Sequence, residues 1–216
     1  MVADIAYMQD QQHSIDRMHE LFAQQRAAYR AAPMPDADSR IQQLNALKSA
    51  LLKHQDALIS AINADFGRRS ADETKLAEIL PAVEGIKYAC KHIRGWMKPS
   101  KRHVSAMNWP GKTWVEYQPL GVVGIISPFN FPAMVPMWFF SIAIATGNAV
   151  ILKPSEKDPS AANWLAAAWA EAGLPAGVFT VLHGDKTAVD GLLEHPDIQA
   201  VSFVGSTPIA RYVYET

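Results

Sequence analysis

The 216-residue sequence contains a single cysteine, Cys90, and this scarcity excludes an internal disulfide framework and any metal site built from several cysteines. Charge of one sign is not in excess either, because 20 Lys and Arg residues face 21 Asp and Glu residues, giving a formal net charge of -1. No overall electrostatic field therefore directs the chain to nucleic acid or to an acidic membrane surface.

Long hydrophobic runs and targeting segments are also lacking. The longest apolar run, residues 131–144, is interrupted by two prolines and a serine and is too short to cross a bilayer. The first residues, MVADIAYMQDQQHS, have neither the basic and apolar regions of a secretory leader nor the Arg-rich composition of a transit peptide. Because 49% of the residues are hydrophobic, we expect a globular protein of the cytoplasm, without a membrane partner or a metal site.

The first hundred residues are predicted to be helical. In residues 14–32 the apolar side chains follow the i, i+3, i+4, i+7 spacing of an amphipathic helix, which prolines 33 and 35 end. Residues 36–66 are predicted to form one long second helix, because Leu and Ile recur on one face until Gly67, a favoured residue after a helix C-terminus.

A third helix is predicted to begin at Ser70. Ser70 and Glu73 have the spacing of a capping box, in which the hydroxyl and the carboxylate each accept a bond from a backbone N–H. The helix is expected to reach about Met97, with a local disturbance at Pro81, which has no N–H to donate. We assign residues 1–102 to this helical region.

The sequence pattern changes after residue 102. β-Branched and aromatic residues lie on either side of Pro110-Gly111, so residues 103–119 are predicted to form two short strands joined by a turn. In residues 120–216 the apolar runs LGVVGII, NAVILK, GVFTVLH and IQAVSFVG alternate with helices that begin near Pro132, Ser160, Lys186 and Pro208. Four successive β-α units predict an α/β fold, with a Rossmann-like parallel sheet covered by helices on both faces.

Polar or flexible residues follow each predicted strand, at the edge where such sheets bind ligands. They are Ser127 to Asn130, Lys153 to Glu156, His183 to Asp185, and Gly205 to Pro208. A Gly-Ser-Thr-Pro sequence at a helix start leaves backbone N–H groups for an anion such as a pyrophosphate. Lys153 can bond phosphate or ribose hydroxyls, and Glu156 can accept a bond from a ribose hydroxyl. These residues match the parts of a nucleotide site.

Each of these features also has a purely structural explanation. Ser206 before Thr207 and Pro208 is typical of an ordinary helix N-cap. Lys153 and Glu156 are also typical of a solvated loop ion pair worth about 0.2–1 kcal/mol. His183 before a glycine is more often a turn residue than a base. Cys90 has cationic neighbours, which favour a reactive thiolate, yet a lone cysteine in a helix is more often a small buried hydrophobe. The G-x-G-x-x-G fingerprint of ordinary dinucleotide folds is absent.

Four stretches in order resemble the cofactor-domain motifs of the aldehyde dehydrogenase superfamily. They are PLGVVGIISPFNFP, GNAVILKPSEKDPSAA, EAGLPAGVFTVLHG and AVSFVGSTPIA. Up to about residue 126 the chain looks like bacterial coniferyl aldehyde dehydrogenases, and from Pro128 it looks like methylmalonate or malonate semialdehyde dehydrogenases. The resemblance implies an aldehyde dehydrogenase cofactor domain in residues 120–216, incomplete at its C-terminal side. The helical arm and the hairpin also match the family, in which such strands take part in homo-oligomers.

The resemblance also implies roles for individual residues. Asn130 matches the asparagine whose amide stabilises the oxyanion formed when a cysteine thiolate attacks the aldehyde; without the resemblance, an Asx-type bond that closes the turn explains this residue equally well. The residues matching the cofactor cleft are Ser127 and Phe129, those on the adenosine ribose side are Lys153, Glu156 and Lys157, and those at the pyrophosphate are Gly205 and Ser206. Glu156 favours NAD over NADP through like-charge repulsion, and Lys157 weakens that preference.

The residues of the family's catalytic cysteine and glutamate base are expected beyond Thr216, and Cys90 lies at the wrong place in the motif order to replace the cysteine. Two functions therefore remain open. One is the cofactor-binding part of an NAD-dependent aldehyde dehydrogenase that is inactive by itself and whose substrate is a coniferyl-type aldehyde or a semialdehyde converted with coenzyme A. The other is a non-catalytic nucleotide-binding or oligomerisation module.

Overall fold

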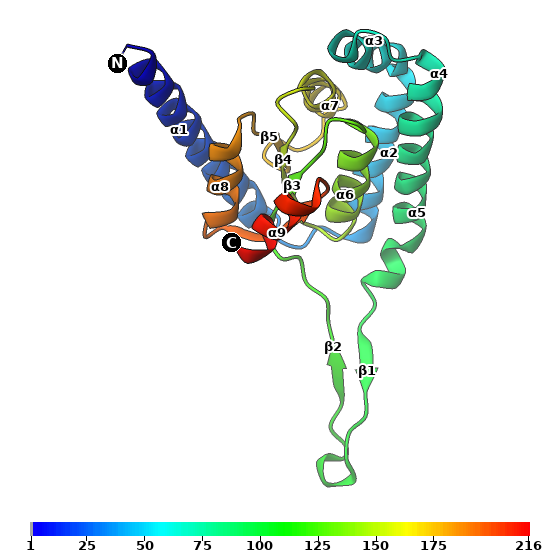
Figure 1. Cartoon of the computed structure of the whole chain (residues 1–216). Coiled ribbons are helices and arrows are strands. Elements are labelled where there is room, and N and C mark those ends of the chain that lie inside the picture. The colour runs from blue at the N-terminus through cyan, green and yellow to red at the C-terminus, as the bar shows by residue number, and fades with distance from the viewer. Residues whose placement is uncertain (1) are drawn as a thin grey trace.

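A helical arm forms the N-terminal part of the protein. The computed structural model describes the backbone of residues 2–216 and the side chains of residues 15–216. The arm consists of α1 (Val2–Ala31), α2 (Ala37–Lys53), α3 (Gln55–Phe66), α4 (Ala71–Thr74), a π-helical turn η1 (Lys75–Ile79) and α5 (Leu80–Trp96). In Figure 1, α1 lies on one side of the molecule, and α2 and α5 run side by side on the other.

The prediction of one helix over residues 36–66 is wrong, because His54 separates α2 from α3. His54 leaves the helical conformation, with φ −112° and ψ 22°, and its N–H donates to Ala50 as α2 ends. Its imidazole Nε2 lies 2.9 Å from Glu171 on α7 (Ser160–Glu171). The break keeps the apolar face of α3 on the core, where Leu58 and Ile62 are buried, so packing overrides the continuous helical pattern. The predicted stop at Gly67 is confirmed by its left-handed φ of 76°.

The start of the third helix differs from the predicted capping box. The hydroxyl of Ser70 accepts a bond from the backbone N–H of Asp72, whereas Glu73 lies 3.7 Å from Arg69 as an ion partner. The disturbance predicted at Pro81 takes the form of the π turn η1, which directly precedes it. A wider turn accommodates a residue that has no N–H and whose ring crowds the preceding turn.

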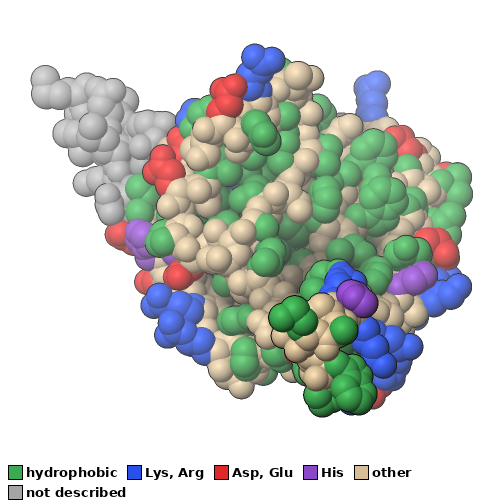
Figure 2. Space-filling model, turned by 90° about the horizontal axis from the view of Figure 1, so that it is seen from below, with side chains coloured by type: hydrophobic (Ala, Val, Ile, Leu, Met, Phe, Trp, Pro, Cys, Tyr) green, Lys and Arg blue, Asp and Glu red, His purple; other side chains and the backbone are tan. Residues whose placement is uncertain are grey.

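A two-stranded hairpin projects from the body of the molecule (Figure 1). Strands β1 (Ser100–Arg102) and β2 (Thr113–Val115) pair in antiparallel fashion, and a 3-10 turn, η2 (Ala106–Asn108), lies near the tip. The first strand therefore precedes residues 103–119, in which both strands were predicted. Hydrophobic side chains gather at the tip in Figure 2, where Met107 is 95% and Trp109 81% exposed. The division of the chain after residues 102 and 119 stays a prediction.

The predicted parallel sheet is confirmed, with all four of its strands at the expected places. Its order is β5-β4-β3-β6, and every neighbouring pair is parallel. The strands are β3 (Val122–Ile126), β4 (Ala149–Lys153), β5 (Phe179–Val181) and β6 (Ile198–Phe203), and the helices that follow them are α6 (Met134–Ala145), α7, α8 (Lys186–Glu194) and α9 (Thr207–Glu215).

Helices cover both faces of the sheet because successive side chains of a buried strand point to opposite faces. Val123 and Ile125 of β3 join the larger core, formed with α6, α7 and the arm helices α2, α3 and α5. Val122 and Ile126 join the smaller core, formed with α1 and α8. The sheet is thus held between most of the helical arm on one side and α1 with α8 on the other.

Replacing Phe22 by Ala tests how firmly α1 is attached. Phe22 is 1% exposed in the smaller core and stacks on the His195 ring with the ring centroids 3.5 Å apart. We expect F22A to lower the free energy of unfolding by about 3–5 kcal/mol, measured by urea denaturation, because the truncation leaves a cavity. The exposed Met107→Ala serves as a control that changes little, and a loss under about 1 kcal/mol for F22A would contradict this packing.

Candidate functional site

The carboxyl ends of β3, β4 and β6 meet at one edge of the sheet. The backbone N–H of Ser127 donates to the carbonyl oxygen of Lys153 at 3.1 Å, and that of Val204 donates to Ile126 at 3.3 Å. Strand β3 lies between its successor β4 and the later strand β6, so the strand order reverses direction here. A reversal of this kind opens a crevice outside the strand ends, which is where open α/β sheets bind ligands.

The structure brings four of the predicted cofactor-binding residues into contact. The ammonium group of Lys153 donates to Glu156 Oε2 at 3.2 Å, and Lys157 Nζ lies 5.2 Å from the centre of the Phe129 ring. The pKa of Glu156 lies below its ordinary value, through a hydrogen bond from its own backbone N–H and then through the bond and charge of Lys153. The ion pair that the structural explanation predicted is therefore present, at the same edge as the other site residues.

Two polar side chains are buried at this edge although neither belongs to the apolar core. Ser127 and Lys153 are each 5% exposed. The Ser127 hydroxyl has no hydrogen-bond partner among the described residues, whereas Lys153 is satisfied by Glu156. Buried polar groups are ordinarily paired, so an orphaned hydroxyl at a crevice is a group that a ligand can satisfy. Ser127 thus fits a cofactor that carries hydroxyl or phosphate groups.

Gly205 and Ser206 are exposed at the start of α9. Ser206 occupies the N-cap position, with φ −71° and ψ 152°, as the capping explanation predicted. Its side chain makes no capping hydrogen bond, so the hydroxyl and the first N–H groups of α9 are available to another partner. The helix start therefore retains the features of an anion site.

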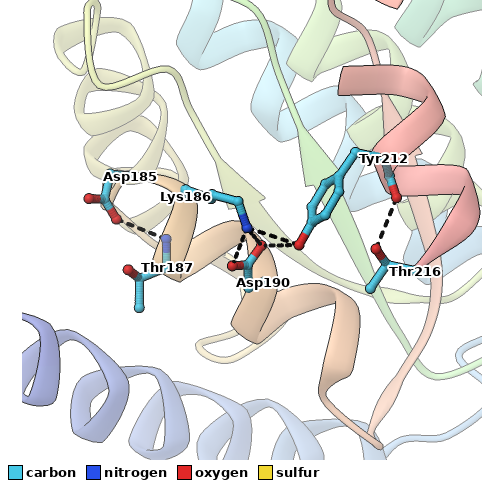
Figure 3. Close-up of polar contacts among 6 residues, drawn as sticks. All are labelled: Asp185, Lys186, Thr187, Asp190, Tyr212 and Thr216. Atoms are coloured by element: carbon cyan, nitrogen blue, oxygen red, sulfur yellow. Dashed lines mark hydrogen bonds and ion pairs between the residues drawn. The ribbon is translucent and has the colours of Figure 1, made fainter. Parts of the chain in front are cut away.

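A polar cluster ties α9 to α8 (Figure 3). Lys186 on α8 donates to Asp190 at 2.6 Å and to the hydroxyl of Tyr212 on α9 at 2.9 Å, and this hydroxyl donates to Asp190 at 2.8 Å. These bonds raise the pKa of Lys186 above its ordinary value. No residue of α9 is buried, so this cluster contributes directly to holding α9, and with it Ser206, beside the sheet.

Asn130 lies in the loop between β3 and α6, and its side chain is exposed. Its amide makes no hydrogen bond to the described part of the chain, so the Asx-type bond that was the alternative explanation is not formed. Its backbone oxygen does have a partner, because Arg69 Nη1 donates to it at 3.0 Å. The arrangement leaves the amide N–H groups of Asn130 free to donate to an oxygen of a bound molecule.

Arg69 and Glu78 are residues near this loop that the sequence did not single out. Arg69 is separated from Asn130 by 61 residues, and Glu78 lies 55 residues before Ala133, whose N–H donates to it. Both charged side chains are almost completely buried, at 4% and 0% exposure, and form an ion pair of 2.8 Å. The sequence gives no signal of their burial, because Arg69 lies just before the predicted third helix and Glu78 lies within it.

A partly buried carboxylate caps the neighbouring helix α7. Asp65 on α3 accepts bonds from the backbone N–H of Ser160 at 2.9 Å and from its hydroxyl at 2.8 Å. Asp158, which is 2% exposed, faces Asp65 and Glu78. Burial, then the hydrogen bond and charge of Asp65, raise the pKa of Asp158 to about 8. At neutral pH Asp158 is therefore largely protonated beside Asp65.

His183 and Cys90, which were also considered as reactive residues in the sequence analysis, have no role in this candidate site. His183 contacts Asn163 at 2.7 Å, and burial with the charge of Lys153 lowers the pKa of its imidazole. Burial also raises the pKa of the Cys90 thiol, more than the charge of Lys48 lowers it, so Cys90 has the character of a packed thiol.

The described helices include none that is both long and apolar enough to cross a membrane. Among the described side chains, no group of three or more His, Cys, Asp or Glu residues is placed to hold a metal ion.

The Asp65–Asp158 pair generates a prediction about pH and stability. Because the folded pKa of Asp158, about 8, lies above its ordinary value of 3.8, its contribution to stability is fully present below pH 3.8 and is lost as pH rises from there to about 8, above which the loss levels off. We expect Asp158→Asn, which is neutral at every pH, to reduce this decline. Melting temperatures between pH 5 and pH 9 would differ by several degrees less than in the unmodified chain, at about 2–4 °C per kcal/mol.

Asp56→Asn, at an exposed position of α3, is the matched control and should keep the decline of the unmodified chain. Equal slopes for D158N and the unmodified chain would contradict the assignment of the proton to Asp158.

Comparisons with known proteins support the resemblance read from the sequence. The chain is 52% identical over 160 residues to a coniferyl aldehyde dehydrogenase by name from Pseudomonas aeruginosa, covering 74% of this chain and 34% of that protein. It is 43% identical over 189 residues to a malonate-semialdehyde dehydrogenase of the same organism, covering 88% and 37%. Both alignments extend across residue 127, where the part that resembles coniferyl aldehyde dehydrogenases meets the part that resembles the semialdehyde dehydrogenases.

The fold is also similar to that of a protein from Sinorhizobium meliloti named as a methylmalonate-semialdehyde dehydrogenase, whose structure was solved in complex with NAD. The similarity covers 93% of this chain and 40% of that one, with 37% identity and a TM-score of 0.84. The chain thus spans about a third to two fifths of the length of these relatives. The model of the aldehyde dehydrogenase family matches residues 5–216, and the chain belongs to that family.

Proposed function

We propose that this chain is the cofactor-binding part of an NAD-dependent aldehyde dehydrogenase of the cytoplasm. The observation that carries the proposal is the unpaired amide of Asn130 at the same sheet edge as the orphaned hydroxyl of Ser127. The oxidation of an aldehyde requires a hydrogen-bond donor to the aldehyde oxygen and a site for the nucleotide cofactor. This part of the enzyme would supply both at one edge of the sheet. The activity of a whole enzyme also needs a nucleophile, for which Cys90 is unsuited.

Asn130 is proposed to donate to the oxygen of the aldehyde as negative charge develops on it. A single donor held at such a position contributes about 10²- to 10³-fold to the rate. The donor has to be fixed before the reaction, because reorientation of the amide would cost part of that gain. The loop around Asn130 is held by its backbone, which leaves the side chain to serve the substrate.

NAD is proposed to lie across the crevice, where it would accept the electrons lost by the aldehyde. Ser127 and Phe129 would line the cofactor cleft. The adenosine ribose side would be met by Lys153, Glu156 and Lys157, and the pyrophosphate by Gly205 and Ser206. Burial holds Lys153 in place, and its ion pair orients Glu156. The carboxylate of Glu156, beside the ribose, would repel the 2′-phosphate of NADP.

Two classes of substrate are proposed, because the resemblance is to two subfamilies. One is a coniferyl-type aldehyde, and the other is malonate or methylmalonate semialdehyde. Coenzyme A as co-substrate belongs to the second possibility alone. Of the two P. aeruginosa relatives, one is named for each class of aldehyde. Similarity does not decide between the two classes, because the relative with the lower identity aligns over more of the chain.

A second candidate function is a non-catalytic nucleotide-binding or oligomerisation module. The hairpin favours it, because Met107, Trp109 and Trp114 expose apolar surface of the kind that protein interfaces bury. The same surface is expected in a homo-oligomeric dehydrogenase, so the two functions differ in catalysis and not in assembly.

Cofactor titration by calorimetry tests the proposed site. We expect NAD to bind more tightly than NADP, and Glu156→Gln to narrow the difference by about fivefold, since two like charges about 4 Å apart in water repel by about 1 kcal/mol. Glu84→Gln, an exposed change on α5, should leave both affinities unaltered. Absence of binding at millimolar NAD, or tighter binding of NADP, would overturn the cofactor assignment.

Replacement of Asn130 by Ala tests the oxyanion role. In a polypeptide that joins this chain to a nucleophilic cysteine, we expect N130A to lower kcat about 10²- to 10³-fold while the affinity for NAD is kept. The chain without such a nucleophile should form no NADH with either class of aldehyde, with or without coenzyme A. An unchanged kcat in N130A would remove the catalytic role of Asn130 and leave the cofactor site standing.

A further inference from the structure

Helix α6 is capped by a carboxylate from a distant part of the chain. The N-cap residue, Ala133, has no side-chain oxygen to offer. Instead, Glu78 Oε2 accepts bonds from the backbone N–H groups of Ala133 at 3.0 Å and of Met134 at 2.7 Å. The π turn η1 contains Glu78 and places its carboxylate, which is 0% exposed, at the first turn of α6.

Arg69 connects this cap to the loop that contains Asn130. Its Nη2 lies 2.8 Å from Glu78 Oε1, and its Nη1 donates to the backbone oxygen of Asn130 at 3.0 Å. The guanidinium carbon also lies 4.9 Å from the ring centre of Phe66 and 5.8 Å from that of Phe131. The planar fork of Arg69 thus contacts Glu78 and the loop at the same time.

Stability by itself does not account for this arrangement. A Ser at residue 133 would cap α6 locally with no buried charge. A buried ion pair carries a desolvation penalty that often cancels its Coulombic gain, and burial raises the pKa of Glu78 in spite of its hydrogen bonds and Arg69. What the pair provides is geometry, because it holds the backbone on both sides of Phe131.

We propose that Arg69 and Glu78, here called the loop clamp, are positioning residues for Asn130. Arg69 fixes the carbonyl group of Asn130 itself, and Glu78 fixes the first turn of α6 three residues later. With its backbone held at both ends, the loop presents the Asn130 amide in one direction without any bond to the side chain. This inference rests on the proposed function, since it assigns the clamp to the oxyanion donor.

Arg69→Lys, compared with Arg68→Lys at the exposed neighbouring position, tests the clamp in the chain as it is. Lysine retains the charge opposite Glu78 but has no planar fork to reach the oxygen of Asn130 as well. We expect the NMR order parameters of the amides of residues 129–131 to fall from about 0.85 to below about 0.6 in R69K. Unchanged chemical shifts in β3 and β4 would show that the sheet is intact.

Two variants of Glu78 separate the acceptor from the charge. Glu78→Gln retains a carbonyl oxygen, so it should keep the amides of Ala133 and Met134 protected from hydrogen exchange, whereas Glu78→Leu cannot. We expect exchange at these two amides to accelerate on the order of tenfold or more in E78L, the equivalent of one lost hydrogen bond. Glu84→Gln on α5 is the control for E78Q.

An R69K loop as rigid as that of R68K, in a folded protein, would overturn the proposal, and so would equal protection in E78L and E78Q. Asn130→Ala distinguishes this failure from failure of the proposed function. N130A should leave the order parameters of residues 131–134 unchanged, because the clamp contacts the Asn130 backbone alone. If the loop stays rigid in N130A and kcat is also unchanged, the oxyanion role of Asn130 is removed and the clamp is retained.

Discussion

Two carboxylates of the helical arm reach the N-termini of the two helices that follow β3 and β4. Glu78 accepts from the first N–H groups of α6, and Asp65 accepts from Ser160 at the start of α7. Each bond satisfies groups that a helix leaves unpaired, and a negative charge there also complements the helix dipole. Because these helices start at the edge where the strands end, the arm determines where the loops of the site lie.

The cost of this arrangement is concentrated in a small buried region. Glu78, Asp65 and Asp158 bring three carboxyl groups near one arginine, Arg69, which cannot neutralise them all. The chain resolves the excess of negative charge by retaining a proton on Asp158. The proposed site thus rests on a network whose protonation is separate from that of the residues proposed to touch a ligand.

The sheet could be predicted from the sequence because its signals are local. Each strand is a short apolar run, and each is followed by a turn and a helix that can serve as the crossover to a parallel strand. The break at His54 could not be predicted, since residues on both sides continue one apolar pattern and the partner of His54, Glu171, lies on the distant helix α7. The residues of the strand ends were likewise found from their positions after the strands. That the hydroxyl of Ser127 has no hydrogen-bond partner is visible only in the folded structure.

The partners of the site were beyond sequence reasoning for a related reason. Arg69 and Glu78 lie in a helical segment whose local pattern explains them as solvated charges, and nothing nearby marks them as buried. The capping box expected at Ser70 is an instance of the same limit, because Glu73 turns to Arg69 instead of to the helix start. Local rules predict which groups need a partner, and the fold decides which partner they obtain.

The strands at the site edge and helix α9 beside them are held in place by different kinds of contact. The region around β3 and β4 is embedded in the core, and its opening would require much of the protein to unfold. Helix α9 buries none of its residues, and the polar cluster of Lys186, Asp190 and Tyr212 that holds it is accessible to water and to salt. Segments with so little buried surface open at low free energy, so α9 is expected to open more readily than strands β3 and β4.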